Sequence, residues 1–131
     1  MDDLTADIVR QWFRKAESDL LNIRNNLASE DVPTDTVCFH AQQAIEKFLK
    51  GALIANGRNI GKTHDLVKLL TDIVDVVPDL SPYEDQFEEI SEYGVGSRYP
   101  DDFYEPTFED AQQAFEIALR VEAIIKRRIT L

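Results

Sequence analysis

Apolar residues recur every three or four positions through most of this chain, and no segment shows the strict alternation typical of a half-buried strand. The repeat is clearest from Ile8 to Leu27 and from Ala111 to Ile129, where it defines one continuous apolar stripe. Five amphipathic segments can be separated in this way. We expect helices at about 5–28, 34–55, 63–77, 81–94 and 107–129.

Polar residues, glycines and prolines mark the ends of these segments. Gly57 predicts a left-handed stop to the second helix, and Thr63 is the expected N-cap of the third. Residues 81–84 and 107–110 both have the spacing of a capping box. The connections are short, so the sequence predicts an all-α protein: an antiparallel up-and-down bundle of four to five helices, forming a single domain over 1–131.

The second predicted helix carries an unusual polar strip beside its apolar stripe. On a helical projection the strip contains Thr36, His40, Gln43, Lys47 and Lys50. An imidazole, an amide and two ammonium groups on one arc suit the binding of an anionic or polar ligand. The alternative is an ordinary solvated face, on which Glu46 and Lys50 form a routine pair one turn apart.

The segment 94–104 is a second candidate for ligand binding. Two glycines precede Arg98 and Tyr99, and the following proline disfavours helix at Tyr99. The planar guanidinium of Arg98 can hold a phosphate or carboxylate, or it can simply pair with nearby acids. Tyr99, Phe103 and Tyr104 can stack on a base or anchor the core, and the sequence leaves both interpretations open.

Metal and cofactor chemistry find little support in the sequence. His64, at the start of the third helix, can cap it, bind an anion or bond locally to Asp65. Cys38 and His40 are two residues apart on a helix and so point to different faces, which argues against a zinc site. No Gly-rich phosphate loop or nucleophile elbow occurs. We expect no metal ion and no cofactor.

Charge narrows the choice of partners. The chain of 131 residues has a net charge of −11, and its segment 83–110 contains many acids with Arg98 as the lone base. Such a surface repels phosphate backbones, so RNA stays open as a ligand but is disfavoured. A basic protein partner or a small ligand fits better, although acidity also serves solubility alone.

The sequence lacks the features of an exported or membrane protein, and this bears on its expected location in the cell. A single cysteine excludes an internal disulfide and fits a reducing compartment. No stretch approaches the roughly 20 apolar residues that span a bilayer, and the first residues do not resemble an export signal. We therefore expect a cytoplasmic protein without membrane contact.

Four motifs, in order along the chain, resemble those of the HEPN domain, a nucleotide-binding domain of higher eukaryotes and prokaryotes. The most specific are the Gln-Gln-x-x-Glu-Lys run ending at Lys47 and the Arg-Tyr-Pro run starting at Arg98. The motifs occupy residues 12–20, 38–50, 64–66 and 97–100. The resemblance implies a helical bundle, usually a homodimer. It also implies a separate minimal nucleotidyltransferase as partner, in a toxin–antitoxin pair, and similarity to the helical domain fused to kanamycin nucleotidyltransferase.

Many HEPN proteins are metal-independent ribonucleases with a histidine four to six residues after the arginine, and this chain departs from that pattern. The permitted positions hold Phe103, Tyr104 and Glu105, and no histidine follows His64. Loss of the imidazole that serves as general acid and base costs about 10²- to 10⁴-fold in rate. Whether the chain is an enzyme stays open, with the sequence favouring a binding protein.

Three hypotheses follow. The first is a binding and interaction module in which Arg98 and Lys47 hold phosphate, Tyr99 stacks, and Gln43 and His40 supply hydrogen bonds. The second is a toxin ribonuclease with a rearranged site, and the third is an assembly scaffold that binds no nucleotide. The candidate ligand residues are Arg98, Tyr99, Lys47, Gln43, His40 and His64.

Overall fold

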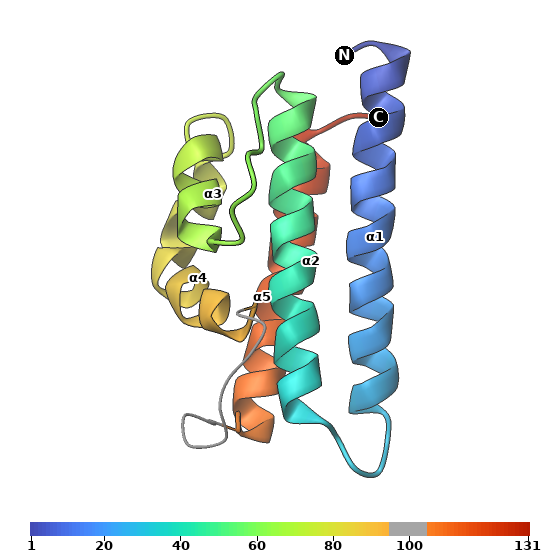
Figure 1. Cartoon of the computed structure of the whole chain (residues 1–131), viewed down its shortest axis with the longest axis vertical. Helices are drawn as coiled ribbons and strands as arrows, with labels where there is room; N and C mark the ends of the chain where they lie inside the picture. The colour runs from blue at the N-terminus through green and yellow to red at the C-terminus, as the bar shows by residue number, and fades with distance from the viewer. Residues whose placement is uncertain (95–104) are drawn as a thin grey trace.

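The computed structural model describes residues 1–94 and 105–131, and within these ranges every regular element is a helix (Figure 1). The predicted all-α fold is confirmed. The elements are α1 (Asp3–Leu27), α2 (Thr34–Ala55), α3 (Leu66–Ile73), the 3₁₀ helix η1 (Pro78–Tyr83), α4 (Glu84–Ser91), the 3₁₀ helix η2 (Glu92–Gly94) and α5 (Phe108–Arg128).

α2 occupies the centre of the bundle. It packs along α1 on one side and along α5 on another, while the short helices α3 and α4 cover a third side. In Figure 1, α1 descends, α2 and α5 both ascend, and the short helices carry the chain between them. Since α2 touches almost every other helix, its apolar residues face several neighbours and its polar residues are left only a narrow strip.

Side-chain caps and a glycine fix several of the helix ends. Asp2 accepts a hydrogen bond from the backbone N–H of Thr5 at the start of α1. Thr107 and Asp110 form the reciprocal capping box predicted for α5, with distances of 3.0 and 2.9 Å. Gly57 follows α2 at φ +69°, so the predicted left-handed stop is confirmed.

The cap predicted at Thr63 is wrong. The N-cap of α3 is Asp65, whose carboxylate accepts from the backbone N–H groups of Val67 and Lys68. The hydroxyl oxygen of Thr63 instead accepts a hydrogen bond from the backbone N–H of Asp65, in the turn before the helix begins. The threonine therefore shapes the turn that positions the capping residue, and α3 is shorter than the predicted 63–77.

The capping box predicted at residues 81–84 is also wrong. The segment Pro78–Tyr83 forms a 3₁₀ helix, and α4 begins directly after it without a side-chain cap at Tyr83. Proline at the first position favours this tight turn. Leu80 is fully buried, which anchors the turn beneath the core.

The core joins α1 and α2 especially closely. The rings of Phe13 and Phe48 meet with centroids 5.5 Å apart. Gly51, inside α2, faces Phe13 so closely that a Cβ would lie 2.6 Å from its ring. The missing side chain lets the two helices approach and brings the polar edge of α1 against the polar strip of α2. No helix in the described ranges is long and apolar enough to cross a membrane.

Candidate functional site

Asp19 of α1 gathers two of the predicted ligand residues from α2. Its carboxylate is almost fully buried, and Lys47 Nζ donates to Oδ2 at 2.6 Å. His40 Nδ1 lies 2.8 Å from Oδ1. We call Asp19, His40 and Lys47 the Asp19 cluster. It joins α1 to α2 and holds an imidazole and an ammonium group on one anionic anchor.

Glu46 is the centre of a second group, formed with residues from α2 and from the loop before α3. Lys50 Nζ donates to Glu46 Oε2 at 3.1 Å, and Gln42 Nε2 donates to Oε1 at 3.0 Å. His64 Nδ1 lies 2.9 and 3.1 Å from the two carboxylate oxygens. We call Gln42, Gln43, Glu46, Lys50 and His64 the Glu46 cluster. It fixes the chain before α3 to the middle of α2.

The Glu46 carboxylate is ionised despite its surroundings. Burial is the largest influence and opposes ionisation, but the hydrogen bonds from Gln42, Lys50 and His64 together outweigh it. The pKa of Glu46 therefore lies below its usual value. The predicted pair of Glu46 and Lys50 exists, but it is buried rather than solvated, with side chains only 5% and 6% exposed.

Gln42 connects this cluster to the end of η2. Its amide is fully buried, and Nε2 also donates to the backbone oxygen of His64 at 3.2 Å. Gln43 Nε2 donates to Gln42 Oε1 at 2.7 Å. A Cβ on Gly94 would lie 2.4 Å from the Gln42 amide carbon, so a side chain at position 94 would force the Gln42 amide to move. The chain thus passes directly over Gln42 just before the segment that carries Arg98.

Four of the six predicted ligand residues fall into the two clusters. His40 and Lys47 belong to the Asp19 cluster, and Gln43 and His64 to the Glu46 cluster. Arg98 and Tyr99 lie outside the described residues. His64 binds Glu46 rather than capping α3, and this partner was not among those expected from the sequence.

A hollow opens beside the Glu46 cluster. It has a volume of about 380 Å³ and lies between the start of α3 and the end of α4. Its lining residues are His64, Asp65, Glu88, Ser91, Glu92 and Gly94. The volume is within the range of small-molecule sites, and the acidic wall disfavours a phosphate group inside it.

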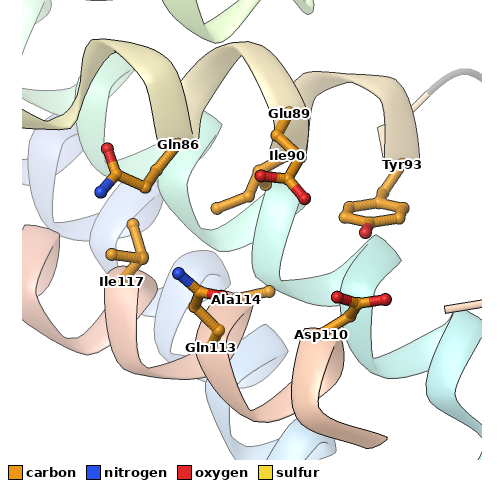
Figure 2. A pocket seen from close by; sticks show the side chains of 8 residues that line it. All are labelled: Gln86, Glu89, Ile90, Tyr93, Asp110, Gln113, Ala114 and Ile117. Atoms are coloured by element: carbon orange, nitrogen blue, oxygen red, sulfur yellow. The ribbon is translucent and has the colours of Figure 1, made fainter. Parts of the chain in front are cut away.

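A smaller cavity lies between α4 and α5 (Figure 2). Gln86 and Ile90 face Gln113 and Ile117 across it, but its volume is only about 20 Å³. That space suits a single water molecule, which could satisfy the buried Gln86 Oε1. A nucleotide does not fit there.

Two residues that organise the clusters were missed from the sequence. Asp19 and Gln42 lie within the HEPN-like motifs at residues 12–20 and 38–50, but the sequence pattern indicates no ligand-binding role for either residue. Asp19 is 28 residues from Lys47, and pairs this distant cannot be read from helical spacing. For Gln42, the available signal was its position between Leu49 and Leu53 on a helical projection of α2.

Cys38 is unsuited to act as a nucleophile. It is fully buried, and burial raises the pKa of its thiol to about 12, with the negative charge of Asp110 adding to the effect. Among residues 1–94 and 105–131, no group of three His, Cys, Asp or Glu side chains could hold a metal ion.

Comparison with known proteins decides the family. A family model described as "HEPN domain" matches residues 9–128, nearly the whole chain. The chain belongs to the HEPN family. A similar fold occurs in the crystal structure of TT1696 from Thermus thermophilus, with a TM-score of 0.77 and 25% sequence identity. The match covers 92% of this chain and 98% of TT1696. No curated protein matches.

HEPN membership points to a nucleotide- or RNA-related function. The two clusters are also connected with the HEPN resemblance. The Gln-Gln-x-x-Glu-Lys run, one of its most specific motifs, supplies four of their residues: Gln42, Gln43, Glu46 and Lys47.

Proposed function

We propose that this HEPN protein binds a nucleotide or a related anionic ligand on the polar strip of α2, and acts as a binding and interaction module rather than as an enzyme. The observation that carries the proposal is the gathering of His40, Lys47, Gln43 and His64 into two organised clusters along α2. A merely solvated face would leave these side chains without buried partners.

Arg98 belongs to this proposal through the connectivity of the chain. Gly94 lies against Gln42, and four residues of extended chain span at most about 14 Å. Arg98 is thus only four residues along the chain from a glycine that lies against Gln42. In the proposed site Arg98 holds phosphate and Tyr99 stacks on a base.

Binding by calorimetry tests the assignment. We expect Arg98→Ala to abolish nucleotide binding while circular dichroism and the unfolding temperature stay unchanged. Arg127→Ala, an exposed arginine at the end of α5, is the matched control and should bind like the parent. Equal affinity of Arg98→Ala and the parent protein would remove Arg98 from the site.

The biological setting is part of the same proposal. We propose a homodimer that works with a separate nucleotidyltransferase in a toxin–antitoxin pair, as HEPN resemblance implies. The support is the acidic surface: the described parts of the segment 83–110 contain no lysine or arginine. Such a surface complements a basic patch on a protein partner. Sequencing the adjacent reading frames, followed by co-expression and co-purification with any minimal nucleotidyltransferase that they encode, tests the partnership.

A ribonuclease is the second candidate, and one contact favours it. A buried carboxylate orients His40 through Nδ1, the arrangement that prepares an imidazole for general-base catalysis. The test is incubation of total RNA with purified protein in the absence of metal. Cleavage lost in His40→Ala, His64→Ala and Arg98→Ala would favour this function, and intact RNA would exclude it. If no nucleotide binds and no RNA is cut, an assembly scaffold is left.

A further inference from the structure

Both histidines of the chain use the same ring nitrogen in the same way. His40 Nδ1 lies against the carboxylate of Asp19, and His64 Nδ1 against that of Glu46. An ionised carboxylate only accepts hydrogen bonds, so Nδ1 carries the hydrogen in each ring. In a neutral imidazole this leaves the lone pair on Nε2.

The Nε2 atoms are available to a ligand. Within residues 1–94 and 105–131 neither has a hydrogen-bond partner, and the side chains of His40 and His64 are 23% and 69% exposed. The ring of Phe39 meets that of His40 edge-on, at 5.4 Å between centroids, which restricts the orientation of the imidazole. Both rings are therefore held at one end and open at the other.

Gln43 adds a third acceptor to the strip. Its Nε2 donates to Gln42 Oε1, so its own oxygen is directed away from that bond. An amide whose nitrogen is engaged in this way offers its carbonyl oxygen to a ligand. Gln43 lies one turn from both His40 and Lys47 on α2, on the same arc.

The ammonium groups of the strip have anionic partners. Lys47 is paired with Asp19 and Lys50 with Glu46, so two ammonium groups face two carboxylates. Lys50 is only 6% exposed and cannot reach a ligand. Both ammonium groups of the strip are therefore already paired with a carboxylate, which weakens the attraction for phosphate that the sequence suggests.

We propose that the strip of α2, together with His64 from the loop before α3, recognises the hydroxyl groups of a ribose, with His40 Nε2, His64 Nε2 and Gln43 Oε1 as hydrogen-bond acceptors. This inference rests on the proposed nucleotide-binding function and specifies which part of the ligand the strip holds. Hydroxyl groups are hydrogen-bond donors, and so they match acceptor atoms whose rings and amide are held at their other end. Phosphate is an acceptor itself and is left to groups outside the strip.

The hydrogen position is measured by ¹⁵N NMR of the imidazoles in the full chain at pH 8. We expect both rings to give the pattern of the neutral tautomer with hydrogen on Nδ1. Charged imidazoles, or hydrogen on Nε2, would overturn the proposal without a variant having to fold. Asp19→Asn should alter the tautomer of His40 alone, whereas Asp7→Asn, an exposed aspartate of α1, should alter neither ring.

Ligand titrations test the chemical class. Adenosine should shift Nε2 of His40 or His64, and 2′-deoxyadenosine should bind about 10-fold more weakly, because one hydrogen bond is lost. Inorganic phosphate should leave both rings unchanged. Phosphate binding that converts the rings to the charged form would overturn the inference. If AMP binds but adenosine perturbs neither ring, the ribose inference alone fails; if neither binds, the proposed function fails as well.

Discussion

The buried carboxylate of Glu46 shows how much a single residue contributes to this protein. Three donors from two segments converge on it, and they keep its pKa below the usual value although burial opposes ionisation. Since the folded-state pKa is lowered, its contribution to stability is fully present above about pH 4.5. That contribution is lost as the pH falls through the folded-state pKa.

Glu46→Gln should therefore destabilise the protein at pH 7, by about 3 kcal/mol or more, because it leaves the buried Lys50 without its anion. The difference from the parent should begin to shrink below the ordinary pKa of glutamate, where the unfolded chain is protonated, and should be lost below the lowered folded-state pKa. Denaturant unfolding at pH 7 and at pH 3.5 measures both values. Glu116→Gln, an exposed glutamate of α5, should show no such dependence; a constant difference across pH would contradict the assignment.

Cys38 gives a second prediction at this scale. Burial raises the pKa of its thiol from 9.0 to about 12, which lowers the thiolate fraction at pH 8 about 10³-fold. Iodoacetamide should therefore label the native protein far more slowly than the unfolded protein. Mass spectrometry of timed samples gives both rates, and comparable rates would show that Cys38 is accessible.

At the scale of helices, local signals worked where partners are close in sequence. The Thr107–Asp110 box and the Gly57 stop were predicted because their residues are within one turn of each other. The start of α3 was not, because two nearby oxygens, from Thr63 and Asp65, compete for the same role and only the folded turn selects one. The start of α4 depends on Leu80 reaching the core, which no local pattern reveals.

Thr107→Ala removes one half of the capping box of α5. We expect a loss of about 1 kcal/mol, because the backbone N–H of Asp110 loses its acceptor. Thermal unfolding followed by circular dichroism measures the change. Thr130→Ala, an exposed threonine after α5, is the matched control and should have no effect.

Gly51→Ala tests the close approach of α1 and α2. Alanine is the better helix former by about 1 kcal/mol, so propensity alone predicts a gain in stability. The new Cβ would lie 2.6 Å from the Phe13 ring, and we expect a net loss of about 1–3 kcal/mol instead. Denaturant unfolding decides the sign. Ala123→Gly, at an exposed position of α5, measures the effect of helix propensity on stability without a steric clash.

At the scale of the whole molecule, the all-helical bundle could be predicted from periodicity alone, whereas the candidate site could be predicted only in part. His40, Gln43 and Lys47 share an arc of one helix, and helical geometry placed them together. Asp19, which holds His40 and Lys47, could not be found in the same way, because it belongs to α1. Two carboxylates, those of Asp19 and Glu46, pair with both ammonium groups of a strip that the sequence alone suggests is basic.

The oligomeric state is a prediction at this scale. A homodimer should elute with about twice the 15.0 kDa mass of one chain in light scattering after size exclusion. The dimer should form without nucleotide. A single-chain mass at micromolar concentration would contradict it.

The central place of α2 has a consequence for genetics. One helix supplies both the middle of the core and the floor of the candidate site, so many substitutions in it will lower abundance as well as binding. A genetic selection scored only by phenotype cannot distinguish loss of folding from loss of binding for substitutions at residues 34–55. A screen that records protein level beside activity in each cell would separate them. Gln43 should stand out as a position where activity falls while abundance holds, whereas loss of His40 or Lys47 also removes a partner of the buried Asp19.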